Sequence, residues 1–293
     1  MLRLFLGLAI LFTYIVMIWG GAVRSTDSGL ACPDWPLCYG SFQLPKDTAA
    51  KLEMGHRTVS GLAGIFVFLT FFFVWFKHKT SPRSAKISAL IALIFTLSAA
   101  LTGMKMIKME TPQLKYLSHM LLESFHIYES MLIMAGLVFT YRFLQGKGLE
   151  KGSIPWWAYA FALITMITGV LVRYTGSGEA CGHQWPLCNG KLIPDLDNWQ
   201  VALQFAHRNI AYVTWLAFLL NMVSNFNRTS LIAFILINLQ FVFAISMVVS
   251  GFFLPFVFLD TAMGFFLFTW LTYNVQLKSA KEQGLAPAWQ ARL

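Results

Sequence analysis

The sequence predicts an all-α integral membrane protein with eight transmembrane helices, arranged as two pseudo-symmetric four-helix bundles. Of its 293 residues, 57% are hydrophobic and only 12% are charged, whereas soluble domains carry about 25% charged residues. Eight apolar stretches and an internal duplication point to the same fold class. The composition excludes a soluble enzyme, a disordered chain and a disulfide-rich miniprotein.

Eight stretches are long and apolar enough to cross a bilayer, whose core of about 30 Å needs about 20 residues of helix. The first resembles a signal peptide because Arg3 precedes it. It lacks a clear small-x-small cleavage site and seven more stretches follow, so we expect it to be retained. The expected spans are residues 4–23, 56–76, 87–101, 116–143, 155–172, 201–223, 231–252 and 255–276.

The basic residues predict the orientation. A net charge of +9 would suit a nucleic-acid partner, but the basic residues occur in short clusters between apolar runs, so we expect none. Of the acidic residues, only Glu150 and Glu282 accompany these clusters. Both termini are therefore expected on the cytoplasmic side of the plasma membrane. The clusters comprise Arg3, Lys77, Lys79, Arg83, Lys86, Arg142, Lys147, Lys151, Arg228, Lys278, Lys281 and Arg292.

Two long loops, residues 24–55 and 173–200, are nearly the same sequence. Segment 23–32 matches 172–181 at an offset of 149, and the Trp-Pro-Leu-Cys segment at 35–38 recurs at 185–188. His56-Arg57 matches His207-Arg208 at an offset of 151. Matches at nearly constant spacing indicate a duplication. We expect two four-helix units, residues 1–150 and 151–293, related by a pseudo-twofold axis along the membrane normal.

Each duplicated loop holds two cysteines on the predicted external face, where thiols can be oxidised. The pairs are Cys32 with Cys38 and Cys181 with Cys188, and nearby prolines and glycines allow close approach. A disulfide within each loop is the favoured interpretation. Free or redox-cycling thiols and a metal site are the alternatives; zinc is disfavoured because the spacing is unusual and only His183 is nearby as a further ligand.

Histidines in membrane helices often mark function, because polar groups there are costly. His56 and His207 stand out, since each precedes an arginine and recurs in its repeat. This recurrence favours a shared ligand role over interhelical hydrogen bonding. Small residues around His56 leave room for a flat ligand, and two histidines on neighbouring helices can fill the axial positions of a haem. His126 is the preferred second ligand, and His119, nearer the outer surface, is the alternative.

A carboxylate lies one helical turn before His56. Glu53 shares a helix face with this histidine, and the matching residue of the second repeat is Gln204. An interfacial helix-end acid is the plain alternative, but the asymmetry suggests chemistry in the first half. Glu123, three residues before His126, is a weaker candidate. Four arginines near the outer boundary suit either haem propionates or snorkelling to the interface: Arg24, Arg57, Arg173 and Arg208.

With these residues in place, the chain resembles the haem A synthase family of membrane enzymes. The resemblance rests on the duplicated Val-Arg-x-Thr-x-Ser-Gly-x-x-Cys and Trp-Pro-x-Cys loops, the Glu53-x-x-His56-Arg57 segment, His207-Arg208 and eight spans in two repeats. It implies an oxidoreductase that converts haem O to haem A for cytochrome oxidase, oxidising a porphyrin methyl group to a formyl group. It also implies a substrate haem in one half and a haem b cofactor in the other.

By this resemblance, His56 and His126 would flank the substrate haem, Glu53 would act at the methyl group, and His207 would hold the haem b. A carboxylate suits the methyl group, because oxidising it builds positive charge and releases protons. Whether Glu53 takes a proton or only stabilises charge stays open. The implied partners are membrane lipid, haem O synthase and an electron acceptor, with homo-oligomerisation left open.

The last span departs from the family pattern, which places a fourth histidine there, whereas this chain has none after His207. Matching Thr140-Tyr-Arg-Phe to Thr272-Tyr-Asn-Val puts Phe258 opposite His126, with Asp260 two residues on. The second haem site is then five-coordinate, uses an unusual ligand, or is empty and structural.

Two functions of different class follow. The first is the enzyme; the second is a haem-binding electron carrier, or an assembly or sensor protein, on the same scaffold. Glu53, His56 and both cysteine pairs favour the enzyme. A transporter has little support, because no span is visibly broken to form a midplane site.

Overall fold

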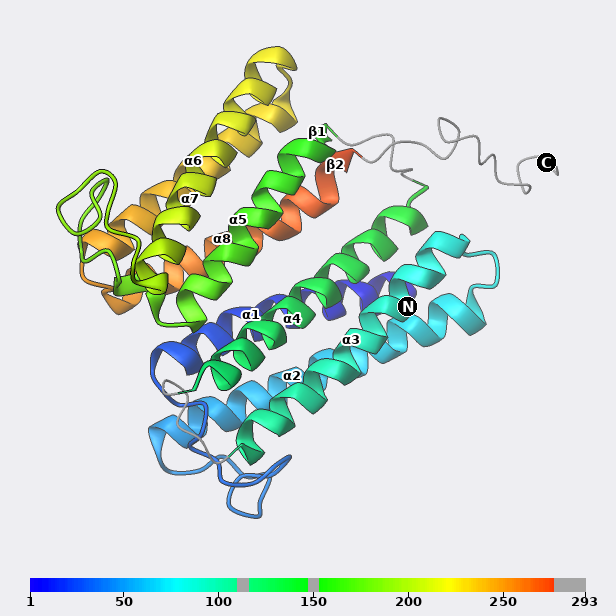
Figure 1. Cartoon of the computed structure of the whole chain (residues 1–293). Coiled ribbons are helices and arrows are strands. Elements are labelled where there is room, and N and C mark those ends of the chain that lie inside the picture. The colour runs from blue at the N-terminus through cyan, green and yellow to red at the C-terminus, as the bar shows by residue number, and fades with distance from the viewer. Residues whose placement is uncertain (110–115, 147–152, 277–293) are drawn as a thin grey trace.

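The computed structural model describes residues 1–109, 116–146 and 153–276, through which eight long helices run (Figure 1). A π-helical turn, η1 (Phe73–Lys77), continues the second helix, and a 3-10 turn, η3 (Ser177–Glu179), lies in the second long loop. Two short strands, β1 (Ile154–Pro155) and β2 (Val275–Gln276), pair in parallel. The long helices are α1 (Leu2–Ser25), α2 (Thr48–Phe72), α3 (Arg83–Lys108), α4 (Leu117–Leu144), α5 (Trp156–Tyr174), α6 (Trp199–Ser224), α7 (Arg228–Val249) and α8 (Leu254–Asn274).

Seven of the eight long helices in the described residues are apolar enough to cross a membrane, so the chain is a multi-pass membrane protein. The expectation of eight apolar spans is confirmed for these seven. The remaining helix, α6, carries Gln200, Gln204, His207 and Arg208 in its first half, which lowers its hydropathy. Gln204 and Arg208 are buried. The polar side of α6 is therefore directed at protein rather than at lipid.

Polar side-chain caps begin α2, α6 and α7, the last through Asn227. The Asp47 side chain accepts a hydrogen bond from the Ala50 amide at 2.9 Å and starts α2 at Thr48, ahead of the expected span at residue 56. Asn198 caps α6 in the same way, through the Gln200 amide at 2.8 Å. Side-chain caps satisfy amide groups that lack partners inside the helix. The ligand candidates of α2 consequently lie inside a helix and not at its end.

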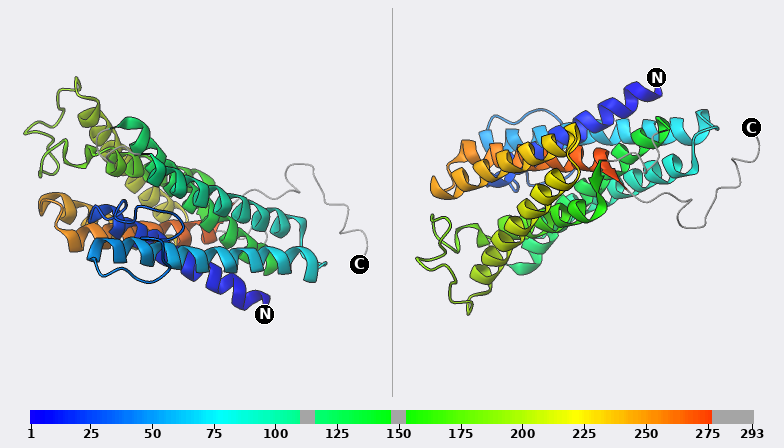
Figure 2. Two further views of the ribbon diagram at one scale, coloured as in Figure 1. Left: turned by 90° about the horizontal axis from the view of Figure 1, so that it is seen from below. Right: turned by 90° about the horizontal axis from the view of Figure 1, so that it is seen from above.

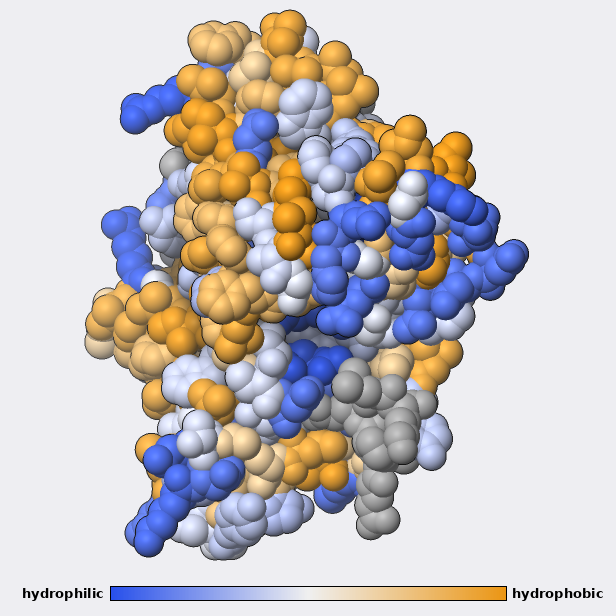
Figure 3. Space-filling model, turned by 90° about the vertical axis from the view of Figure 1, so that its left-hand side faces the viewer, coloured by the Kyte–Doolittle hydropathy of each residue, from blue (hydrophilic) through white to orange (hydrophobic). Residues whose placement is uncertain are grey.

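The helices pack mainly as sequence neighbours, α1 with α2, α3 with α4, α5 with α6 and α7 with α8. Helices α1–α4 lie beside α5–α8, and contacts between these sets involve α1, α4, α5 and α8 (Figures 1 and 2). Met17, Met134, Tyr174 and Phe268, one from each of these four helices, share a buried cluster. The long loops project from one end of the molecule, whose surface mixes hydrophilic and hydrophobic patches (Figure 3).

One residue used to predict the orientation lies elsewhere than expected. Arg142 is 2% exposed rather than free in a basic connection, and it donates hydrogen bonds to the carbonyls of Thr272 at 3.2 Å and Val275 at 2.8 Å. It therefore ties α4 to the end of α8, where carbonyls lack helical partners.

Other residues used to predict the orientation lie outside the described residues, as does the boundary between the two units. They are Lys147, Glu150, Lys151, Lys278, Lys281, Glu282 and Arg292.

Candidate functional site

A cavity of about 950 Å³ lies among α1, α2, α3 and α4. Ligand sites typically measure about 300–1,000 Å³, so this one is large enough for a sizeable molecule. It extends from Trp35 in the first long loop to Leu69 near the end of α2, and its wall is mostly apolar. The titratable side chains that line it are Arg24, Glu53, His56, Arg57, His119, Glu123, His126 and Tyr174.

His56 lines the cavity from α2, with its ring against α1. A Cβ atom added at Gly20 would lie 3.1 Å from the His56 Nε2 atom, so glycine leaves the room that the ring occupies. His126 lines the same cavity from α4, and a Cβ at Gly103 would lie 3.7 Å from its ring. The two histidines therefore line one cavity from different helices. The structure thus brings together the two residues that the sequence selected from separate helices.

His119 and His126 both lie on α4 and both line the cavity. The side chain of His126 is 22% exposed, whereas that of His119 is fully buried, with its Nδ1 atom 3.8 Å from Glu123 Oε1. A ring nitrogen has to be reachable from the cavity before it can bind an iron. Exposure therefore favours His126 as the partner of His56.

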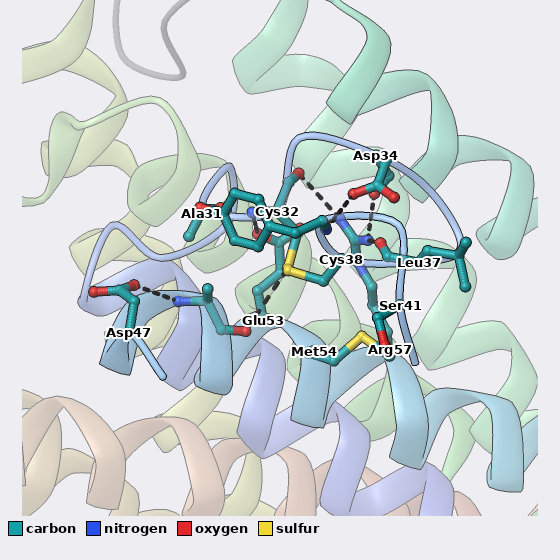
Figure 4. Close-up of a disulfide and its surroundings, with 12 residues drawn as sticks. Ala31, Cys32, Asp34, Leu37, Cys38, Ser41, Asp47, Glu53, Met54 and Arg57 are labelled. Carbon is teal, nitrogen blue, oxygen red and sulfur yellow. Dashed lines mark hydrogen bonds and ion pairs between the residues drawn. A yellow bond between two sulfur atoms is a disulfide. The ribbon is translucent and has the colours of Figure 1, made fainter. Parts of the chain in front are cut away.

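Glu53 lies at the loop end of the cavity and is 4% exposed. Its Oε2 atom accepts a hydrogen bond from the Cys32 amide at 2.8 Å, and its Oε1 atom accepts one from Arg57 (Figure 4). Both oxygens of the candidate catalytic carboxylate are therefore held by donors of the protein. Hydrogen bonds to an ionised oxygen are strong and fix its position.

Both predicted disulfides are present, and all four cysteines of the chain are used in them. Cys32 bonds Cys38, with Cα atoms 4.9 Å apart, and Cys181 bonds Cys188, with Cα atoms 4.3 Å apart. The first bond lies directly above Glu53 and Arg57 in the loop that closes this end of the cavity (Figure 4). Free thiols and a metal site built from these cysteines are excluded by the bonds.

Arg57 and Arg208 clamp the two disulfide loops. Arg57 donates through Nη1 to the carbonyls of Asp34, at 2.5 Å, and Leu37. Arg208 donates through Nη1 to the carbonyls of Gln184, at 3.1 Å, and Leu187, at 2.9 Å. Both arginines thus bond the protein itself instead of only reaching toward the interface. In the sequence, the feature that marks both arginines is the His-Arg pair that recurs in the two repeats.

The other two boundary arginines also have protein partners. The Nε atom of Arg24 is 3.5 Å from Glu123 Oε2, and its guanidinium lies 5.9 Å from the centre of the Tyr174 ring. Arg173 donates to Gly21 O at 3.1 Å and to Ser25 Oγ at 2.6 Å, which joins α5 to α1. Arg24 lines the cavity, whereas Arg173 connects the two sets of helices.

Glu129 is a residue near the site that the sequence interpretation missed. It is fully buried on α4, its Oε1 atom accepts a hydrogen bond from Ser98 of α3, and its Oε2 atom is 3.9 Å from His126 Nδ1. The signal was available, because an acid three residues after a histidine shares its helix face, as Glu53 does before His56.

In the second half, His207 has a polar partner. Its Nδ1 atom lies 2.9 Å from the Thr168 hydroxyl, and a Cβ at Gly169 would lie 3.1 Å from its ring. The Thr168 hydroxyl also lies 3.0 Å from the carbonyls of Ile164 and Thr165. When its proton is donated to one of these carbonyls, the hydroxyl can accept from His207 Nδ1–H, which leaves the Nε2 lone pair free. Asp260, near the position of the missing histidine, accepts from Gln240 Nε2 at 2.7 Å.

Comparison with known proteins identifies the family of this chain. The family model COX15-CtaA, described as "Cytochrome oxidase assembly protein", matches residues 3–52 and 46–272. A "Heme A synthase" of Halalkalibacterium halodurans is 30% identical over 302 residues, which cover 95% of this chain and 97% of the relative. Proteins of the same name from Staphylococcus haemolyticus and Listeria welshimeri are 31% and 33% identical, over 80% and 69% of this chain and 80% and 71% of their own lengths. This chain therefore belongs to the COX15-CtaA family.

Proposed function

We propose that the protein is a haem A synthase, which oxidises a porphyrin methyl group of haem O to the formyl group of haem A for cytochrome oxidase. The observation that carries the proposal is the cavity of the first half, where His56 and His126 come from different helices and Glu53 lines the same wall. Relatives that carry the name "Heme A synthase" support the same reaction.

The cavity fits a haem as substrate. Its wall is mostly apolar, as a porphyrin face requires, and His56 and His126 would supply imidazole ligands for the iron. His126 is the ligand rather than His119, because His119 has no exposed ring surface. The glycine at position 20 leaves space in which the His56 ring can turn toward an iron.

Glu53 acts on the methyl group chiefly through its charge. Two donors, Arg57 and the Cys32 amide, hold its oxygens and stabilise the carboxylate as an anion. A fixed negative charge at the cavity wall stabilises positive charge that develops at the ring-attached carbon, without any reorganisation during the reaction. The hydrogen bonds make this role a better fit than that of a freely mobile base.

The second half fits a haem held by one histidine. Thr168 keeps His207 in the tautomer whose Nε2 can bind iron, while Phe258, which has no ligand atom, is at the position that corresponds to His126. We therefore assign His207 as the protein ligand of haem b. When bound, haem b would supply one-electron transfer.

The architecture and setting complete the proposal. Residues 1–150 and 151–293 are two duplicated units that form pseudo-symmetric four-helix bundles, in the plasma membrane with both termini cytoplasmic. The N-terminus lies at the end of the molecule opposite the disulfide loops (Figure 2). A cytoplasmic N-terminus would therefore place these loops on the external, oxidising side of the membrane. Haem O synthase is the partner that would supply the substrate, and an electron acceptor would reoxidise the protein.

Co-expression with a haem O source tests the function directly. Extracted haems, separated by chromatography, should contain haem A for the unchanged protein and none for His56→Ala. Glu53→Gln, which keeps the shape and removes the charge, should lower haem A about 100-fold or more, in the range of about 10²–10⁴-fold for a lost catalytic group.

The matched control is Gln204→Ala at the corresponding position of the second half, which should still produce haem A. Haem O that stays unconverted beside a folded, haem-loaded protein would support the electron carrier instead. Haem A that persists undiminished in Glu53→Gln would remove the role assigned to this carboxylate.

A further inference from the structure

Several buried polar atoms beside the cavity lack hydrogen-bond partners among the residues that the structure describes, and two of them lie near each other on α4. These two are the Nδ1 atom of His126 and the Oε2 atom of Glu129, and they are 3.9 Å apart. That distance is too long for a hydrogen bond. The other carboxylate oxygen, Oε1, accepts a hydrogen bond from Ser98 on α3, which fixes the carboxylate beside the ring.

A fully buried carboxylate in the middle of a membrane helix is costly, and such residues usually serve a function. The hydrogen bond from Ser98 satisfies one oxygen of Glu129 and joins α3 to α4, but it leaves the second oxygen unused. The nearest counterpart is the histidine one turn earlier on the same helix. A purely structural role for Glu129 would not explain why its unpaired oxygen lies near a buried, unpaired nitrogen of that ring.

The chemistry of a ligating imidazole explains the pairing. A neutral ring has one N–H group, so when Nε2 binds a metal, Nδ1 carries the proton and needs an acceptor. Carboxylates commonly accept this hydrogen bond, fix the orientation of the ring and raise its basicity as a ligand. A small rotation of the His126 ring would bring Nδ1 within reach of Glu129.

We propose that Glu129 is a positioning residue that accepts the Nδ1 proton of His126 and directs Nε2 into the cavity. This inference rests on the proposed function, because it takes His126 as a haem ligand. When a haem is bound, a more basic imidazole would stabilise its ferric over its ferrous state. Glu129 would therefore lower the reduction potential of a haem bound in the first half.

The second half lacks this arrangement. The alignment that matches His126 to Phe258 matches Glu129 to Thr261, which donates to Val257 O at 2.7 Å and accepts from Arg173 at 2.8 Å. At this matched pair of positions, the carboxylate is thus found in the half whose helix carries a histidine one turn earlier. In the first half, the carbonyl of Ala99 on α3 is a competing acceptor near the His126 ring.

The test uses the full-length protein with His207→Ala, so that the haem signal comes from the first half, loaded with haem O. Glu129→Ala should weaken haem binding by about 10-fold to 100-fold, as is usual for loss of such a partner. Glu129→Gln should retain haem better, because its amide oxygen still accepts a hydrogen bond. Both variants should shift the midpoint potential to more positive values and change the ferric EPR g values.

Ser124→Ala is the matched control, because this buried α4 hydroxyl bonds Met120 O within its own helix. It should change neither potential nor affinity. Unchanged potential and g values in both Glu129 variants would overturn the proposal and identify Ala99 O as the acceptor. If His207→Ala fails to fold, the protein with His207 intact is used, and the haem of the first half is identified as the part of the spectrum that is lost in His126→Ala. If His126→Ala removes no haem, the first half binds none, and the proposed function is refuted.

Discussion

The two disulfide loops agree in detail, whereas the cavity residues beneath them do not. In each loop an arginine clamps two carbonyls, Arg57 in the first and Arg208 in the second. In each, a side chain bonds the amide of a left-handed glycine, Asp34 to Gly40 at 2.9 Å and Gln184 to Gly190 at 2.9 Å. Each loop also contains a cis Trp-Pro bond and a disulfide.

Beneath the loops the matched positions carry different chemistry. Glu53 corresponds to Gln204, His126 to Phe258 and Glu129 to Thr261. The features that hold a loop on a helix end are thus kept in both halves, while ionisable groups able to act on a bound molecule are concentrated in the first. The loop clamp is therefore common to both halves, and under the proposed function the acids and His126 define the reacting half.

Removing His126 should have the largest effect on haem A production among the variants that test this comparison. His126→Phe gives the first half the residue of the second, and it removes one of two proposed iron ligands. We expect haem A production to fall more than about 100-fold, beyond the usual cost of losing only a partner of a ligand. Chromatography of extracted haems measures the product, and absorbance at the Soret band measures haem loading.

The converse exchange sharpens the result. Phe258→His restores a histidine to the second half and should convert its haem from high-spin to low-spin without creating a second reacting site, because Gln204 carries no charge. Production of haem A by His126→Phe at the level of the unchanged protein would show that the halves do not differ in the way proposed.

Loss of Arg57 and loss of Arg208 should lower the free energy of unfolding by different amounts. Arg57→Ala leaves the buried carboxylate of Glu53 without its charged partner, which costs about 3–5 kcal/mol in comparable buried pairs. Arg208→Ala leaves only the neutral carbonyls of Gln184 and Leu187 without their donor, and should cost about 1–3 kcal/mol. Thermal unfolding in detergent compares the variants. Equal losses would mean that Glu53 does not depend on Arg57 for its charge.

The sequence predicted what depends on local pattern and on repetition. Apolar stretches predicted the helices, because backbone N–H and C=O groups in lipid have to form their hydrogen bonds within the helix. Repeated spacing gave both disulfides and selected His56 and His207. Helix starts were missed where a polar cap such as Asp47 precedes the apolar run, since hydropathy carries no signal for a cap.

What the sequence could not predict depends on contacts between distant helices. Arg142 was placed in a basic connection, yet it is buried because the end of α8 offers it two carbonyls. Ser98 and Glu129 are on different helices, and only packing of α3 on α4 makes them partners. The choice between His119 and His126 likewise needed side-chain exposure, which spacing along one helix cannot give.

The smallest expected effect concerns a feature that both halves share. A Cβ at Gly20 would lie 3.1 Å from the His56 ring, and one at Gly169 would lie 3.1 Å from the His207 ring. Alanine in a helix gains about 0.5–1 kcal/mol over glycine, while overpacking costs about 1–3 kcal/mol, so the gain offsets part of the loss of stability in either variant.

The ring itself has to move by a few tenths of an ångström, so Gly20→Ala and Gly169→Ala should each weaken haem binding, by similar factors, in separate titrations. Equal factors fit two imidazoles that both bind iron from matching notches in α1 and α5. A loss confined to Gly20→Ala would leave His207 without a ligand role, because its ring would then tolerate displacement at no cost to a bound haem.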